Sequence, residues 1–354
     1  MIELIRRLDR DRFTVHVACF DTMGAWFDRV KPHAASVASF PIRGFGRPHT
    51  MLRLGQFARW CRRQRIAIVQ TCDLYANIFG LIGAALAGVP VRIGSRRELN
   101  PDKTPAQIRL QRFAYRFATR IVANSDAAAT ALAGDGVSRA SIAVIPNGLD
   151  AAAYTPQEQR RRVRTVITVA NLRVEKGHET LIAAAAAVAR SNPDVRFQVV
   201  GGGPRRSELD ALAHAKGVAD RMEFLGHRDD VPALLQAADL YVLPSRSEAF
   251  PNGAIEAMAA GLPVIASGVG GLRQLIDHGR TGLLVPPGDP DALAAAIDSL
   301  VADPMRAHGL GAAARADVVA RYSFDRMVQA FEQLFEDQWR GRLALRTQAA
   351  QQGV

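Results

Sequence analysis

The chain has 354 residues, of which 48% are hydrophobic, and this is enough material for two domains with separate cores. Its three cysteines are odd in number and form no CxxC pair, which argues against a disulfide framework and for reduced thiols in the cytoplasm. The net charge is +11, and because no apolar run reaches the about 20 residues that a membrane-spanning helix needs, the composition excludes an integral membrane protein.

The excess of positive charge lies entirely in the first half of the chain. Residues 1–150 hold 22 Lys and Arg against 11 Asp and Glu, whereas residues 151–354 hold 23 of each. A one-sided basic domain suits an anionic partner, and lipid headgroups, a phosphorylated acceptor and nucleic acid are the candidates. The alternative is an arginine-rich composition with ordinary solvated helix faces.

Strands and helices alternate through the first half of the chain. Residues 1–8 show helical periodicity, and residues 13–20 alternate apolar and polar side chains as a strand does. Further elements are predicted as helices at 51–65, 74–87 and 108–120 and as strands at 66–71, 91–95, 120–125 and 142–146. This alternation is typical of parallel α/β units.

Two of the predicted helices, 51–65 and 108–120, are basic and amphipathic. The second carries one stripe of arginines, namely Arg109, Arg112, Arg116 and Arg120. Such helices suit the surface of an anionic membrane. The alternative, which we favour, is that their apolar faces pack on the sheet like those of any surface helix.

The second half repeats the alternation after a charged linker at 155–164. Strands are predicted at 165–170, 197–200, 221–226 and 240–243. Gly177 opens a helix after the first of these strands, with Lys176 just before it, and a glycine cluster at 201–204 follows the second. A strand-end glycine turn suits a doubly wound sheet but is by itself a weak sign of nucleotide binding.

The stretch from residue 244 to residue 263 reads PSRSEAFPNGAIEAMAAGLP. It places Glu248 in a loop after a strand and Glu256 on a helix that begins near Asn252. The first turn of a helix leaves backbone N–H groups free to bind an anion. One interpretation is a capped helix with a surface acid, and the other is a binding site that combines two carboxylates with an anion-binding helix end.

This stretch resembles the Glu-x7-Glu motif of the retaining family 4 glycosyltransferases of GT-B fold. In that family the first Glu approaches the donor sugar and the second holds the nucleotide ribose. The resemblance continues through Asp289 as GLPVIASGVGGLRQLIDHGRTGLLVPPGD. Residues 146–150, PNGLD, are similar to the signature at the end of the family's first domain, and residues 175–177 to its EKG motif.

The resemblance implies an α/β fold of GT-B type, with two Rossmann-like doubly wound domains facing a cleft. Residues 1–154 are expected to form the acceptor-side domain and residues 155–323 the nucleotide-sugar-binding domain. Residues 324–354 are expected to form a helix that crosses back to the first domain and frays from Arg340 on, where apolar periodicity ends. In the family a strand and a Gly-rich loop precede the first helix, and both are expected to be missing here.

The resemblance also implies roles for individual residues. Lys176 is the diphosphate-binding lysine, and Arg173 replaces an arginine that the family has at Asn171. Glu248 accepts from hydroxyls of the donor sugar, and Glu256 holds the ribose diol. The expected catalytic residues are Glu248, Lys176 and Arg173, and the other expected donor-binding residues are Glu256, Phe250, Pro251, Asn252, Gly253 and Gly202. No metal is expected, because the sequence lacks a DxD pair or a His cluster placed to hold one.

The acceptor side is expected near the strand at 91–95. The family often has a His in the loop after this strand, where the chain has Arg96 and Arg97. Arg96, Arg97, Tyr75 and Asn77 are therefore assigned to the acceptor side. Core or capping roles are the alternative for Tyr75 and Asn77.

The expected activity is retaining transfer of a sugar from a nucleotide diphosphate, UDP rather than GDP, to a glycan or lipid-linked acceptor in cell-surface polysaccharide synthesis. The resemblance implies attack on the front face of the sugar without a protein nucleophile, and no cofactor or nucleic acid is expected. The expected location is the cytoplasm, with the inner face of the membrane as a candidate docking surface. The alternatives are an epimerase or phosphorylase on a similar scaffold and a catalytically silent sugar-nucleotide-binding or membrane-associated protein.

Overall fold

The computed structural model describes all of the chain except residues 24–26, 46, 100–102, 157–161 and 352–354 and the side chains at 346 and 349–351. The chain divides into two compact units, one of residues 1–146 with 324–354 and one of residues 147–323. The linker expected at 155–164 lies in part outside the described residues. Among the helices of the described part, none combines the length and the apolar composition that crossing a bilayer requires.

The unit of residues 147–323 is built on one parallel sheet with the strand order β12-β11-β10-β7-β8-β9. Its strands are β7 Thr165–Val169, β8 Arg196–Val200, β9 Met222–Gly226, β10 Leu240–Leu243, β11 Val264–Ser267 and β12 Leu283–Val285. The chain starts in the middle with β7, extends to β9 on one side, and then returns to β10 beside β7. The order of the strands therefore reverses between β7 and β10, and ligands of doubly wound sheets bind at the carboxyl ends of the strands at such a point.

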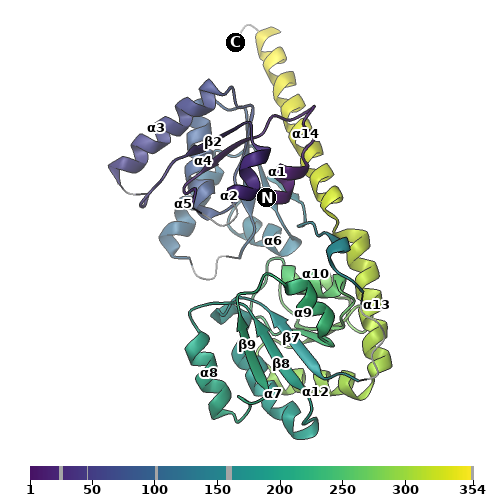
Figure 1. Cartoon of the computed structure of the whole chain (residues 1–354). Helices are drawn as coiled ribbons and strands as arrows, with labels where there is room; N and C mark the ends of the chain where they lie inside the picture. Colours follow the sequence, from purple (N-terminus) through teal and green to yellow (C-terminus); the bar gives the residue numbers. More distant parts are fainter. Residues whose placement is uncertain (24–26, 46, 100–102, 157–161, 352–354) are drawn as a thin grey trace. The chain divides into compact units, whose positions relative to one another are not determined.

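Helices cover both faces of this sheet, as Figure 1 shows for α7, α9, α10 and α12. Val166 of β7 packs in a cluster with α7, α8 and α12, whereas the next residue, Ile167, packs in a cluster with α9, α10 and α13. The helices are α7 His178–Ser191, α8 Arg206–Ala215, α9 Val231–Ala237, α10 Asn252–Ala259, α11 Leu272–Leu275, α12 Pro290–Ala302 and α13 Pro304–Arg321, with 3-10 turns η3 Ala151–Ala153 and η4 Val174–Lys176. Burial on both faces explains why β10 is apolar at every position.

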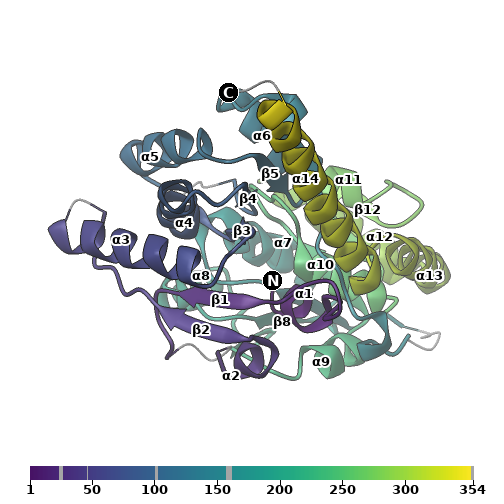
Figure 2. The ribbon, with the colours of Figure 1, turned by 90° about the horizontal axis from the view of Figure 1, so that it is seen from above.

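The other unit contains a four-stranded parallel sheet in the order β3-β4-β5-β6 and a parallel pair, β1-β2, whose strands lie side by side in Figure 2. The strands are β1 His16–Cys19, β2 Ser36–Ser39, β3 Ile68–Gln70, β4 Val91–Arg96, β5 Arg120–Ala123 and β6 Ile142–Val144. The helices are α1 Ile2–Arg7, α2 Phe27–Val30, α3 Pro48–Arg63, α4 Leu74–Ala87, α5 Pro105–Tyr115, α6 Asp126–Gly134 and α14 Phe324–Gln351, with 3-10 turns η1 Lys31–His33 and η2 Arg139–Ser141. Val91 and Ile93 of β4 share one core cluster with α1 and α14.

Two boundaries differ from those expected from the sequence. Residues 147–154 belong to the second unit, because Leu149 is buried in its core and its N–H donates to the Tyr322 carbonyl at 2.8 Å. The unit boundary therefore follows residue 146 rather than residue 154. Helix α14 continues to Gln351, so the prediction that the chain frays from Arg340 is wrong, and an ion pair of 3.1 Å between Arg340 and Glu336 supports the continuing helix.

The arginine stripe expected on one helix at 108–120 is also divided between elements. Helix α5 begins earlier, because Thr104 and Gln107 form a reciprocal capping box at its start. The helix ends at Tyr115, so Arg116 follows it and Arg120 is the first residue of β5. The continuous basic helix that would suit a membrane surface is therefore not present in this form.

Candidate active site

The loop after β10 places Glu248 at the switch point of the sheet. Glu248 is only 6% exposed, and its Oε1 accepts a hydrogen bond from the buried Ser245 hydroxyl at 2.8 Å. The Glu248 carbonyl accepts the Gly271 N–H at 2.9 Å, and the neighbouring Gly270 has φ +44° with the Glu248 carbonyl 2.0 Å from where a Cβ would lie. Only glycine fits that close approach, so the segment at Gly270 and Gly271 packs directly against the loop that carries Glu248 and supports it.

Lys176 lies at the end of η4, in the connection after β7, and its Nζ lies 2.6 Å from Glu248 Oε1. The approach depends on Gly177, which has φ +65° and would place a Cβ 2.1 Å from the Pro244 carbonyl. Because any side chain at this position would push the two loops apart, Gly177 allows the lysine and the acid to meet. The ion pair fixes a cation and a carboxylate beside each other at the carboxyl ends of β7 and β10.

Glu256 is the second acid of the predicted pair and lies on α10. Its partial burial raises the pKa of the carboxyl group to about 7. Within the part of the chain that the structure describes, this carboxylate has no hydrogen bond and no ion pair. A carboxylate of this kind is suited to accept hydrogen bonds from hydroxyl groups of a ligand.

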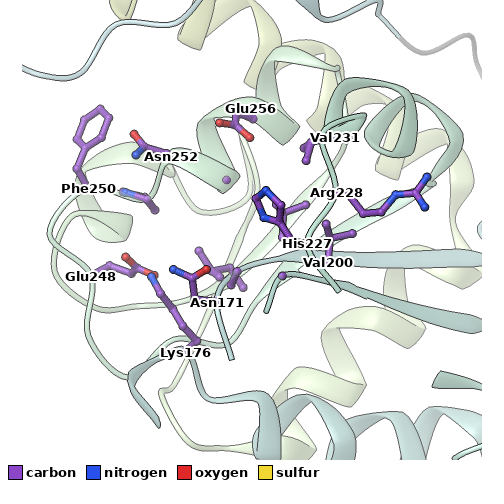
Figure 3. A pocket seen from close by; sticks show the side chains of 16 residues that line it. Asn171, Lys176, Val200, His227, Arg228, Val231, Glu248, Phe250, Asn252 and Glu256 are labelled. Carbon is purple, nitrogen blue, oxygen red and sulfur yellow. The ribbon is translucent and has the colours of Figure 1, made fainter. Parts of the chain in front are cut away.

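These groups converge on one cavity of about 310 Å³ at the carboxyl ends of β7, β8 and β10. Figure 3 shows Lys176, Glu248 and Asn171 grouped at one end, and His227 and Val231 towards the other end, with Glu256 above. The lining consists of Val169, Ala170, Asn171, Lys176, Val200, Gly201, His227, Arg228, Val231, Leu243, Glu248, Phe250, Pro251, Asn252, Gly253 and Glu256.

The amino end of α10 adds a donor to this cavity. The N–H groups of Ala254 and Ile255 both donate to the Pro251 carbonyl, whereas the Gly253 N–H has no acceptor among the described residues. Together with the ammonium group of Lys176, it offers positive charge to an anion in the cavity. The arrangement can therefore hold an anionic group near Lys176 and a hydroxyl-bearing group near Glu256.

Most of the residues predicted for the donor site line this cavity, but two do not. The side chain of Arg173 is half-exposed, with Glu175 as its ion-pair partner at 4.0 Å, and Asn171 lines the cavity in its place. Gly202 does not line the cavity either, whereas Gly201, the residue directly after β8, does. The sequence prediction missed Asn171, His227, Arg228 and Val231 as lining residues, although the position of 227–231 after a predicted strand places them at the same edge of the sheet.

The residues predicted for the acceptor side lie in the other unit, and two of them are engaged in its interior. Asn77 is fully buried, donates to the Ser95 carbonyl at 2.7 Å and accepts the Ser95 N–H at 3.1 Å. Arg96 is 6% exposed, forms an ion pair with Asp135 and donates from Nε to the Glu98 carbonyl at 2.9 Å. Both side chains link elements of the sheet and its loops, which is the alternative role foreseen for Asn77.

The remaining two predicted acceptor-side residues are more accessible. Tyr75 is 41% exposed, stacks on Phe45 with the ring centroids 5.9 Å apart, and accepts from the Gln107 amide at 3.1 Å. Arg97 follows β4 and is half-buried. These two positions keep surface for contact with another molecule.

Comparison with known proteins agrees with this geometry. The model of the family Glycosyltransferase Family 4 matches residues 1–153, and the model Glycosyl transferases group 1 matches residues 155–317. The GDP-mannose-dependent alpha-(1-6)-phosphatidylinositol monomannoside mannosyltransferase of Mycobacterium tuberculosis is 35% identical over 52% of this chain and 53% of its own length. The 2-deoxystreptamine glucosyltransferase of Streptomyces kanamyceticus is 32% identical over 66% of each chain.

A solved structure covers more of the chain. HepE from Anabaena, crystallised in complex with UDP and glucose, is 25% identical, covers 95% of this chain and 94% of its own, and superimposes with a TM-score of 0.83. The curated relatives, by contrast, are matched over only about half to two thirds of their length. From the two family models and the two parallel α/β units, the chain belongs to the GT-B glycosyltransferases that join a family 4 domain to a group 1 domain.

Proposed function

We propose that the chain is a retaining glycosyltransferase that moves a sugar from a nucleotide diphosphate, with UDP as the favoured carrier, to a glycan or lipid-linked acceptor in cell-surface polysaccharide synthesis. The observation that carries the proposal is the convergence of Lys176, Glu248 and Glu256 on one cavity at the switch point of the second sheet. Sugar transfer leaves negative charge on a diphosphate, and that charge needs stabilisation. Lys176 and the Gly253 N–H, which has no acceptor among the described residues, are available for it.

The proposed binding mode places the donor along the cavity. The diphosphate lies against Lys176 and the start of α10, and the ribose diol donates to Glu256, which lacks another partner in the described residues. The base lies towards His227 and Val231, at the end away from Lys176 in Figure 3. Arg173 has no role in this arrangement, because its side chain does not line the cavity.

Glu248 is proposed to face the donor sugar. Its Oε1 is occupied by Lys176 and Ser245, whereas Oε2 has no partner among the described residues and is available for a sugar hydroxyl. The carboxylate also stabilises positive charge that develops at the anomeric carbon. The ion pair with Lys176 holds both groups in place before the donor binds.

The proposed reaction breaks the bond between the anomeric carbon and the phosphate oxygen and forms a bond from that carbon to the acceptor oxygen on the same face. The acceptor proton passes to the departing phosphate oxygen, so no protein nucleophile is required. This differs from retaining hydrolases, in which a second carboxylate attacks the sugar. The proposal assigns no metal to this step, and Lys176 stabilises the negative charge on the departing diphosphate.

UDP is preferred over GDP on the basis of HepE, which was solved with UDP and with UDP-glucose and aligns over most of this chain. The mannosyltransferase relative uses GDP-mannose but matches only about half of this chain. A thermal-shift screen with UDP-, GDP- and ADP-sugars separates the three. A larger stabilisation by a GDP- or ADP-sugar than by every UDP-sugar would overturn the choice of UDP.

The activity is tested by incubating the chain with a UDP-sugar labelled in the sugar and with a lipid-linked acceptor. Transfer with the donor's anomeric configuration kept supports the proposal, and inversion overturns the retaining mechanism. Release of an altered sugar would instead indicate an epimerase. Binding without turnover, across a panel of donors and acceptors, would indicate a catalytically silent sugar-nucleotide-binding protein.

A further inference from the structure

A second cavity lies in the unit of residues 1–146 with 324–354, which contains none of the residues assigned above to the donor. Its volume is about 600 Å³, and it is formed by the last turns of α5, the start of β5 and the turn between α6 and η2. Among its lining residues are Arg109, Arg112, Phe113, Arg116, Arg120 and Asp135. Because β5 begins at Arg120, the cavity lies at the amino end of that strand.

The charge of the lining is strongly one-sided. Asp135 is the single carboxylate among the described residues that line it, and this group forms ion pairs with Arg112 and with the buried Arg96. Burial acts to raise the pKa of Asp135, but hydrogen bonds from these two guanidinium groups hold it below its usual value, so the carboxylate is ionised. Its charge is thus already shared between two cations.

The other three arginines have no such counter-charge. Arg109 and Arg116 are exposed, and neither side chain has an ion pair or hydrogen bond within the described part of the chain. Arg120 donates to the Ala140 carbonyl, but its Nε is buried and has no hydrogen-bond partner among the described residues. A buried N–H without an acceptor is costly, and an oxygen supplied by a ligand would satisfy it.

A purely structural role explains only part of this cluster. Arg112 and Arg116 lie at the carboxyl end of α5, where positive charge stabilises a helix. That explanation does not extend to Arg109, which lies earlier in the helix, or to Arg120 in the following strand. It also leaves unexplained why the arginines surround an open cavity.

We propose that this cavity binds a phosphate-bearing ligand with two or more negative charges, such as a phosphate monoester or a diphosphate. The planar guanidinium fork matches phosphate oxygens, and Arg109, Arg116 and Arg120 are the three cations that such a ligand would neutralise. Phe113 is 48% exposed at the cavity and packs edge-on against Phe117 at 5.4 Å. It offers an apolar surface to the organic part of the ligand.

The test uses the full chain and inorganic pyrophosphate as the probe, and hydrogen–deuterium exchange, followed peptide by peptide, distinguishes binding in this cavity from binding in the donor cavity. Hydrogen–deuterium exchange is expected to slow at residues 109–121 and 135–141 when pyrophosphate is added. The double variant Arg109→Gln/Arg116→Gln is expected to bind the probe at this site at least about tenfold more weakly, because each lost arginine removes a charge-assisted contact. Both replacements are at exposed positions, so folding is expected to persist.

The matched control is Arg59→Gln/Arg63→Gln, which removes the same charge from exposed positions on α3 of the same unit. The proposal is overturned if pyrophosphate gives no protection at 109–121 and 135–141, or if the two double variants lose the same affinity. Vesicles of phosphatidic acid in phosphatidylcholine identify the source of the phosphate. Co-sedimentation that only the Arg109→Gln/Arg116→Gln variant loses would indicate a lipid headgroup, and soluble binding without co-sedimentation would indicate a free phosphorylated compound.

Discussion

Replacing Glu256 by Gln is expected to weaken donor binding and, at the same time, to stabilise the free protein. The side chain is partly buried, has no partner among the described residues, and has its pKa raised from 4.5 to about 7 by that burial. A group placed in this way costs folding free energy when it is ionised. The neutral amide keeps the shape and removes that cost, but it loses the negative charge that would hold two ribose hydroxyls.

The sign and size of the stability change follow from the pKa. An acid whose pKa is higher in the folded state than in the unfolded state loses stability as the pH rises through that window, here from about 4.5 to about 7. At about 1.4 kcal/mol for each pKa unit, the cost to the wild type reaches up to about 3 kcal/mol above pH 7. Glu256→Gln should therefore match the wild type near pH 4 and exceed its free energy of unfolding by about 2–3 kcal/mol at pH 8.

Donor binding should change in the opposite direction. Since only the ionised carboxylate accepts both hydroxyls, and its ionised fraction falls from about one half at pH 7 to about one eleventh at pH 6, the affinity of the wild type for UDP-glucose should fall about fivefold over this range. The affinity of Glu256→Gln should be low and independent of pH over this range. UDP-glucose is the appropriate ligand because, unlike UDP, it has no phosphate group that titrates near pH 7.

The two measurements are urea unfolding from pH 4 to pH 8 and calorimetric titration with UDP-glucose. The control is Glu223→Gln, at an exposed position on β9, which should change neither quantity by much. A Glu256→Gln protein that is less stable than the wild type at pH 8 would refute the reasoning about burial. Unchanged affinity for UDP-glucose would remove Glu256 from the donor site.

Three further substitutions test other parts of the structure. Lys176→Met should lower the affinity for UDP-glucose, measured by calorimetry, about ten- to a hundredfold, whereas Lys216→Met, at an exposed position, should not change it. Equal affinities of the two variants would contradict the proposed diphosphate site. Gly177→Ala should lower both the melting temperature and donor affinity more than Gly217→Ala, because both have positive φ but only Gly177 meets a carbonyl; equal effects would contradict the close approach. Asn77→Ala should lower the free energy of unfolding by about 2–3 kcal/mol and leave the affinity for UDP-glucose unchanged. A variant of full stability that no longer transfers sugar to the acceptor would instead support an acceptor-binding role for Asn77.

The sequence alone predicted the parts of the fold that depend on local pattern. The α4 helix has the predicted bounds, and the apolar run at 240–243 is a strand because a parallel strand covered on both faces must be apolar throughout. The prediction was less accurate at α5, where the capping box at Thr104 and Gln107 moved the start of the helix. The end of α14 was mispredicted because loss of apolar periodicity marks the end of packing, and a helix of good helix formers can continue beyond it.

Within the candidate site, the sequence by itself determined the loop that carries Glu248 and the helix that carries Glu256, because one strand, one loop and one helix start place both acids. Only the tertiary structure decided which cation meets them. Lys176 and Glu248 are 72 positions apart, and their side chains meet where Gly177 closely approaches the Pro244 carbonyl. The sequence likewise placed Arg109, Arg112, Arg116 and Arg120 on one stripe, but only the packing between α5, β5 and the turn after α6 brings these arginines together with Asp135 around one cavity.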